Sequence, residues 1–390
     1  MVHFQEVVIV AAVRTPVGSF QKSLAKFTAT ELGALAIKGA LAKVPNLPVA
    51  QVEEVFMGNV VSAGLGQAPA RQAALKAGLL DSTEATTVNK VCASGSKAVI
   101  FAAETLALGH RSVVVAGGME SMSNVPFYFP RGAQFGHQTA QDGIIKDGLW
   151  DVYNNVHMGN CAEETAVEYN ITREEQDAHA ISSYKRSAEA WEKGLFKEEV
   201  IPVTIKSPKG DKIIDRDEEY TNVKFDKIPT LKGVFVKSGT VTAANSSTLN
   251  DGASALILTT RAKADELGIK PLARILSFGE AATAPKKFTI APSLAIPIAL
   301  KRAGLSKDDV SLFEINEAFS AVVKANEKIL SLDPAKINVA GGAVSLGHPI
   351  GSSGSRILVS LVHLLKPGQI GVTGICNGGG AASSIVIERL

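Results

Sequence analysis

The chain has 390 residues, of which 46% are hydrophobic and 20% are charged, a composition typical of a globular protein of two to three domains. Lys and Arg number 40 against 38 for Asp and Glu, and a net charge of only +2 argues against a nucleic-acid-binding protein, which needs a strong basic excess. No stretch approaches the roughly 18 apolar residues of a membrane span, and three cysteines are too few for a disulfide framework.

The N-terminal residues lead directly into a β-branched run over residues 7–13, without the features of a signal or transit peptide. We therefore expect a reduced, cytoplasmic protein with no membrane contact. The first half of the chain then alternates strand and helix patterns. These are a helix over 30–44, a strand over 52–58, a strand over 86–91, a turn at Cys92, a helix over 94–108 and a strand over 113–118.

The second half repeats this order. It shows a strand over 272–278, a helix over 292–303, a strand over 310–315 ending at Asn316, a strand over 337–340 before the turn with His348, a helix over 353–365 and a strand over 370–375 ending at Cys376. Residues 250–258 also resemble residues 379–387. Such internal similarity predicts two related halves.

We predict an N-terminal half made of residues 1–118 and 249–270, an inserted domain over 119–248 and a C-terminal half over 271–390. Strands alternating with helices indicate an α/β fold with mixed, mainly parallel sheets. The strands are continuously apolar, so helices should cover both faces of each sheet.

Three residues of unusual chemistry fall at strand ends, where α/β folds gather ligands: Cys92, Asn316 and Cys376. Cys92 begins a helix, whose N-terminus favours a thiolate, although a free Cys is more often a core residue. Cys376 opens a glycine-rich turn that suits an oxyanion site, and Asn316 is also a good helix N-cap. His348 lies in a turn too rich in Gly and Pro for a core stripe, and we interpret it as a general base.

These motifs resemble those of the thiolase family, and specifically its short-chain acetyl-CoA acetyltransferases, over essentially the whole chain. The resemblance is carried by residues 91–95, 117–123, 316–319, 347–349 and 376–379. It implies two pseudo-symmetric βαβαβαββ halves, layered α/β/α/β/α, with an inserted loop domain. No single motif is decisive, but five in the family's order are highly specific.

The resemblance also implies a reaction, the condensation of two acetyl-CoA molecules to acetoacetyl-CoA and CoA, and its reverse. Cys92 would be the nucleophile, His348 its base and Cys376 the acid/base for the second substrate. Asn316 would hold a water that stabilises the enolate, and the backbone of Gly378 would complete the oxyanion hole. In a cytoplasmic protein this reaction would feed mevalonate and sterol synthesis.

Further residues carry over from the family as expected ligand contacts. For CoA they are His157, Met158, Asn222, Val223, Lys224, Lys227, Ser247, Ala318 and Phe319. For a potassium ion, the one cofactor expected beside CoA itself, they are Tyr184, Ala243, Ala244, Ser246 and Val344. Residues 123–142, with the run 127–129, would form the contact of a homotetramer, with a dimer as the alternative.

Three other interpretations compete. A cysteine hydrolase also pairs Cys with His, but would pass its acyl group to water. A condensing enzyme of the ketosynthase type has the same fold, but carries His in the place of Cys376. A carrier of CoA or lipid would bind acetyl-CoA without a covalent adduct.

Overall fold

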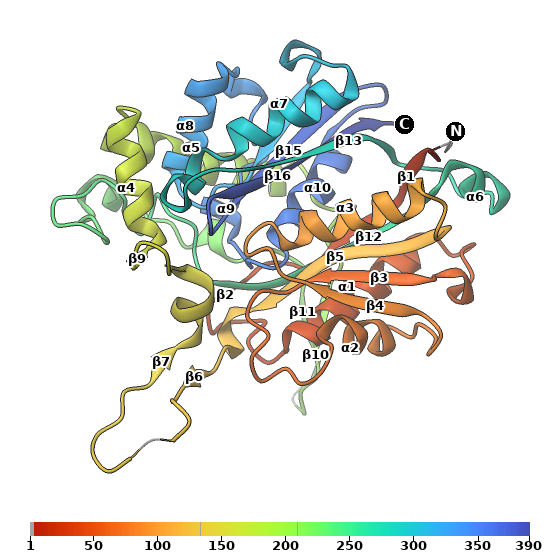
Figure 1. Ribbon diagram of the computed structural model, residues 1–390, viewed down its shortest axis with the longest axis horizontal. Coiled ribbons are helices and arrows are strands. Elements are labelled where there is room, and N and C mark those ends of the chain that lie inside the picture. Colours follow the sequence, from red (N-terminus) through yellow and green to blue (C-terminus); the bar gives the residue numbers. More distant parts are fainter. Residues whose placement is uncertain (1–3, 133, 209) are drawn as a thin grey trace.

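The computed structural model describes residues 4–132, 134–208 and 210–390. Its main sheet consists of two parts joined edge to edge (Figure 1). The N-terminal part has the order β4 (Glu84–Val88), β3 (Glu54–Gly58), β5 (Val113–Ser121), β12 (Asn250–Thr260), β1 (Val7–Arg14), with β2 (Gly18–Ser19) paired to β12. The C-terminal part has the order β13 (Ala273–Ala282), β16 (Ala381–Arg389), β15 (Ile370–Asn377), β14 (Leu312–Ile315).

The junction between the two parts is short. Val8 pairs with Arg274 and Ile9 pairs with Ala273, in antiparallel register. β12 follows the long insertion in the sequence, yet it lies between β1 and β5 in the sheet. The insertion therefore leaves and re-enters the N-terminal part without interrupting it.

Helices cover both faces of each part. α3 (Ser94–Ala107) and α10 (Ser353–Leu364) pack against each other between the two parts (Figure 1). α1 (Ala29–Lys43) and α2 (Pro69–Lys76) cover the outer face of the N-terminal part, and α7 (Pro292–Ala303) and α8 (Ser320–Leu330) that of the C-terminal part. α6 (Arg261–Glu266) follows β12, and the single-turn helix α9 (Ala343–Leu346) precedes His348.

The boundaries of these helices follow from local chemistry. Thr28 and Glu31 form a capping box at the start of α1, each side chain accepting the other residue's backbone N–H. α7 ends at Gly304, whose φ of 71° lies in the left-handed region that glycine adopts without strain.

The insertion contributes two long helices and three short hairpins. The helices are α4 (Met158–Glu168) and α5 (Arg173–Glu192), and the hairpins are β6 (Phe127–Tyr128) with β7 (Gln141–Asp142), β8 (Trp150–Asp151) with β9 (Val156–His157), and β10 (Val203–Ile205) with β11 (Lys212–Ile214). The β6–β7 hairpin extends away from the rest of the molecule (Figure 1). Within the described residues, no helix is long and apolar enough to cross a membrane.

Two expectations about the strands were wrong. The sheet is not mainly parallel, because among the strands of the described residues only β3–β4, β3–β5 and β14–β15 pair in parallel. A short turn such as the one between β15 and β16 forces antiparallel pairing. Residues 337–340 form no strand beyond a single bridge between Phe313 and Ile337, since Asn338 turns the chain with a φ of 47°.

Candidate active site

Cys92 lies in the tight turn between β4 and α3, where only 4% of it is exposed. Val91 before it has a φ of 48°, which turns the chain sharply into the helix. The backbone N–H groups of Cys92 and Gly378 both point at the Cys92 sulfur and favour its thiolate, but burial outweighs them and raises the pKa to about 12. Cys92 is therefore a thiol at rest. The helix N-terminus alone does not ionise it, contrary to what the sequence suggested, and a base is needed to form the thiolate.

Cys376 is fully buried near the end of β15. Burial raises the pKa of its thiol, and a negative charge on Cys92, when its thiolate forms, raises it further, because the two side chains are within electrostatic range of each other. The turn that follows needs glycine: Gly380 has a φ of 85°, and a Cβ there would lie 2.3 Å from the carbonyl oxygen of Thr283. This turn brings the N–H of Gly378 to Cys92.

His348 has one defined tautomer. The Ser353 hydroxyl donates to the carbonyl of Pro349 at 3.0 Å, so its oxygen accepts from Nδ1 of His348 at 2.6 Å. Nε2 is then the unprotonated nitrogen, and within the described residues it has no hydrogen-bond partner. Burial, together with the positive charge of Arg356, lowers the pKa of His348 to about 3, so the ring is a neutral proton acceptor.

Asn316 follows β14, the parallel neighbour of the strand that carries Cys376. Its backbone N–H donates to the carbonyl of Gly374 at 2.9 Å. Asn316 and Cys376 therefore lie at the same end of these two neighbouring strands. The side chain is fully buried, and neither polar atom has a partner among the described residues. Buried amides are almost always hydrogen-bonded, so this one is available to a substrate or a water.

A cavity of about 430 Å³ opens beside these residues. Val91 and Gly378 line its inner side, and Met158 and Phe288 flank them. Residues 146–148, from the π-helix Ile144–Leu149, and residues 150–153, from the β8–β9 hairpin, also line it. A ligand in this cavity meets the Cys92 turn directly.

The arrangement has the parts that acyl transfer needs. It offers a nucleophilic thiol, an imidazole with a free acceptor nitrogen, two backbone donors for an oxyanion and a second thiol. Among the described residues, no group of three or more His, Cys, Asp or Glu side chains is placed to hold a metal ion.

Comparison with known proteins identifies the family. Residues 7–262 match the model of the thiolase N-terminal domain, and residues 269–389 match that of the thiolase C-terminal domain. The chain belongs to the thiolase family. It is 58% identical to the mitochondrial acetyl-CoA acetyltransferase of Mus musculus, over 99% of this chain and 91% of that one. It is also 58% identical to the mitochondrial acetyl-CoA acetyltransferase of Danio rerio, over 98% of this chain and 92% of that one.

Solved structures agree. The Acat5 thiolase of Ascaris suum, crystallised with coenzyme A, is 46% identical and superposes with a TM-score of 0.95 over 99% of this chain and 100% of that one. The acetyl-CoA acetyltransferase of Bacillus anthracis is 39% identical, with a TM-score of 0.97 over the whole of both chains. The thiolase fold, the family and the acyltransferase class predicted from the sequence are confirmed.

The cytoplasmic location expected from the sequence is contradicted. The relatives at 58% identity are named as mitochondrial proteins. The expectation was wrong because it depended on the first residues of the chain, which are no guide to the compartment of this thiolase.

Most of the predicted CoA contacts lie close together. The His157 ring stacks on Phe235 at 4.8 Å between centroids, and Phe235 meets Phe319 edge-on at 6.1 Å. The backbone N–H and hydroxyl of Ser247 both donate to the carbonyl of Ala318, at 3.0 and 2.9 Å. Met158 connects this group to the cavity.

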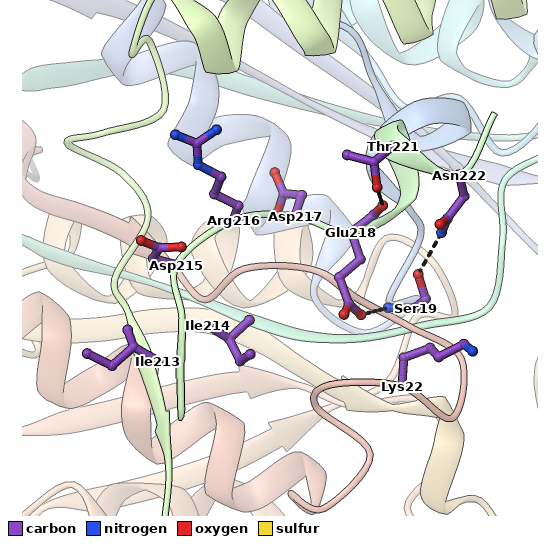
Figure 2. Close-up of a pocket in the computed structure, with 10 residues that line it drawn as sticks. All are labelled: Ser19, Lys22, Ile213, Ile214, Asp215, Arg216, Asp217, Glu218, Thr221 and Asn222. Atoms are coloured by element: carbon purple, nitrogen blue, oxygen red, sulfur yellow. Dashed lines mark hydrogen bonds between the residues drawn. The ribbon is translucent and has the colours of Figure 1, made fainter. Parts of the chain in front are cut away.

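Asn222 lies elsewhere, in the lining of a second cavity of about 440 Å³ (Figure 2). There it donates to Ser19 at 3.3 Å, and Glu218 accepts from the backbone of Ser19 at 2.8 Å. Lys224 and Lys227 follow on the exposed surface, whereas Val223 packs against Tyr184.

The residues predicted to bind potassium fall into two groups. Tyr184 and Val344 share a small buried cluster. Burial raises the pKa of Tyr184 to about 12, and the charges of Glu219 and Glu317 add to this effect. Ala243, Ala244 and Ser246 lie in one turn, where the Ser246 hydroxyl donates to the carbonyl of Thr242 at 2.7 Å.

Several residues of the site were not predicted from the sequence. Ser353 fixes the His348 ring, and Asn250 accepts the backbone N–H of His348 at 2.8 Å. Glu120 accepts the backbone N–H groups of Val60 and Gly351, each at 3.0 Å. A serine five residues after His348 is a weak signal in the sequence, and the other contacts depend on the tertiary fold.

Proposed function

We propose that this thiolase is an acetyl-CoA C-acetyltransferase, which condenses two acetyl-CoA molecules to acetoacetyl-CoA and CoA and also catalyses the reverse cleavage. One observation carries the proposal: the sulfur of Cys92 faces two backbone N–H groups and lies near the second sulfur, that of Cys376. The relatives named as acetyl-CoA acetyltransferases support the choice of substrate.

In the first half-reaction, His348 accepts the proton of Cys92 at Nε2 as the sulfur attacks the thioester carbon. The bond from that carbon to the CoA sulfur breaks, CoA leaves as a thiolate, and Cys92 is acetylated while His348 keeps the proton at Nε2. The N–H groups of Cys92 and Gly378 stabilise the tetrahedral oxyanion, and the loss of one such donor typically costs about 2.7–4 kcal/mol of barrier.

Before the second half-reaction, Cys376 gives its proton to the CoA thiolate, and the Cys376 thiolate then removes a proton from the methyl group of a second acetyl-CoA. Its raised pKa makes the thiolate a strong base once formed. The Nε2–H of His348, which holds the proton taken from Cys92, and a water held by Asn316 stabilise the enolate oxygen. The enolate carbon attacks the acetyl group, the bond to Cys92 breaks, and the Cys92 thiolate regains its proton from His348.

Coenzyme A would occupy the strip formed by His157, Met158, Ser247, Ala318 and Phe319. Apolar surface suits the pantetheine arm. The exposed lysines Lys224 and Lys227, with Asn222 and Val223 beside them, suit a phosphate group.

A potassium ion fits the residues proposed for it. The Tyr184 phenol faces two carboxylates, which create a negative potential, and a phenol with carbonyl oxygens is a suitable donor set for a hard cation. A bound ion would neutralise the negative charge of these carboxylates, at the point where Tyr184 of the insertion packs against Val344. Comparing steady-state condensation with and without potassium tests this assignment, with no change counting against it.

We also propose the division into residues 1–118 with 249–270, 119–248 and 271–390, and a homotetramer formed through the β6–β7 hairpin. Phe127 and Phe129 on that hairpin are 64% and 63% exposed, which suits a subunit contact. Residue 133 of this segment lies outside the described residues. The predicted role in mevalonate and sterol synthesis depended on a cytoplasmic location and is not part of the proposal.

The function is tested by assaying acetoacetyl-CoA formation in the Cys92→Ser and Cys376→Ser variants. Both should lose condensation, but only Cys376→Ser should still exchange labelled CoA into acetyl-CoA, because exchange needs the first half-reaction alone. Normal condensation by Cys376→Ser would show that another group is the base. Rapid release of acetate would favour the hydrolase instead.

A further inference from the structure

A buried carboxylate next to Asn316 has no part in the proposed mechanism. Glu317 is fully buried, and four groups from three segments donate to it: His179 Nε2 at 3.1 Å and Ser183 Oγ at 2.7 Å from α5, Asn338 Nδ2 at 2.9 Å, and the Val344 N–H at 3.1 Å. Burial alone would raise the pKa of Glu317, but His179 and the other donors outweigh it and lower the pKa to about 2. Glu317 is therefore an ionised hub that ties the insertion to the catalytic half of the molecule.

One of these donors holds both neighbours of Asn316. The side chain of Asn338 accepts the Ile315 N–H at 2.8 Å and donates to the Ile315 carbonyl at 2.8 Å, in addition to its bond with Glu317. Asn338 has a φ of 47°, a conformation that asparagine tolerates better than most residues. A single amide thus fixes the backbone before Asn316, at Ile315, and the side chain of the residue after it, Glu317.

The Asn316 side chain has no such support of its own, because neither of its polar atoms has a partner among the described residues. Its direction depends on the backbone that carries it, and the bonds of Glu317 and Asn338 fix that backbone. Polar groups behind a catalytic residue commonly set its orientation.

We propose that Glu317, held by Asn338 and His179, is a positioning residue that fixes Asn316 for the enolate step. This inference builds on the proposed function, since it assigns the effect to the second half-reaction. Acetylation of Cys92 does not involve Asn316. Loss of a hydrogen bond to Glu317 should therefore slow condensation and leave acetylation unchanged.

His179 is the best place to test this, because it comes from α5 in the insertion and contacts neither the cavity beside Cys92 nor the His348 turn. His179→Phe keeps a ring but removes the donor to Glu317. His179→Gln keeps an N–H donor and is the matched control. The measurements are the kcat and KM for condensation, and the rate at which labelled CoA exchanges into acetyl-CoA.

We expect His179→Phe to lower the kcat for condensation about tenfold, the effect of losing one hydrogen bond to a charged group, with exchange within about twofold of the wild type. His179→Gln should restore most of the kcat. Equal losses in exchange and condensation, or no loss in either, would overturn the proposal. If His179→Phe does not fold, His179→Leu, which also lacks the donor to Glu317 but is smaller, gives the same comparison. Absence of exchange in the wild-type protein would instead refute the proposed function, and this inference with it.

Discussion

The Nδ1 atom of His348 lies 2.6 Å from the hydroxyl oxygen of Ser353, whose proton is directed to the carbonyl of Pro349. This contact leaves Nε2 as the basic nitrogen. We predict that Ser353→Ala lowers the rate of Cys92 acetylation roughly fivefold, because a net loss of about 1 kcal/mol in fixing the tautomer corresponds to about that factor. Single-turnover measurement of acetylation checks this. Ser352→Ala, one residue earlier, is the control, and a loss of the same size there would point to damage at the start of α10.

The depressed pKa of His348 gives a prediction for stability. The folded ring titrates at about 3, whereas an unfolded histidine titrates near 6.5. Between these values the unfolded state binds the extra proton, so the contribution of His348 to stability is complete above about pH 6.5 and is lost as the pH falls toward 3.

The difference in unfolding free energy between wild type and His348→Gln isolates this effect. The comparison is needed because Glu120 and Glu314, whose pKa values burial raises to about 7 and about 8, act in the opposite direction over part of this range. Urea titrations at pH 7.5 and 5 should show the wild type losing stability relative to the variant at the lower pH. A difference independent of pH would be evidence against the neutral ring.

A buried ion cluster gives a prediction for the fold. Arg14 donates to both Glu199 and Asp217 from a fully buried position. Arg14→Met would leave two buried carboxylates uncompensated, which typically costs about 3–5 kcal/mol. Lys43→Met breaks the exposed pair with Glu198 and should cost at most about 1 kcal/mol. Urea unfolding of both variants provides the test. Similar unfolding midpoints for the two variants would show that the buried ion cluster does not stabilise the fold as expected.

Close packing around the turn that carries His348 gives a prediction for activity. A Cβ on Gly118 would lie 2.0 Å from the carbonyl oxygen of Gly351, a backbone atom that cannot turn aside. Gly118→Ala should displace this turn and abolish condensation. Gly304→Ala has open space around it and should cost only the strain of a left-handed alanine, about 1–2 kcal/mol. Activity in Gly118→Ala close to that of the wild type would show that the turn can move.

Much of this architecture could be predicted from the sequence, because continuous apolar strands and capped helices are local features. The helix expected over 292–303 is α7 as observed, and the positions of Cys92, Asn316 and Cys376 at strand ends follow from the same pattern. The antiparallel pairing of β12 could not be predicted from local sequence, because the strand follows a long insertion and its partners are set by the tertiary fold.

The chemistry of the site was less predictable than its residues. A helix N-terminus favours a thiolate, but the burial that raises the pKa of Cys92 is a property of the folded molecule. Glu317 belongs to the motif over residues 316–319, which could be recognised in the sequence. Its bonds to His179 and Asn338 could not be predicted, because they join segments far apart in the chain.

The central claim is that Cys92 carries the acyl group between two CoA molecules, and peptide mass spectrometry after brief incubation with acetyl-CoA tests it most directly. We expect one acetyl group on the peptide that contains Cys92, which disappears when CoA is added and never forms in Cys92→Ser. An acetyl group on Cys376 or Cys161 instead, or an unmodified Cys92 in a protein that still makes acetoacetyl-CoA, would contradict it.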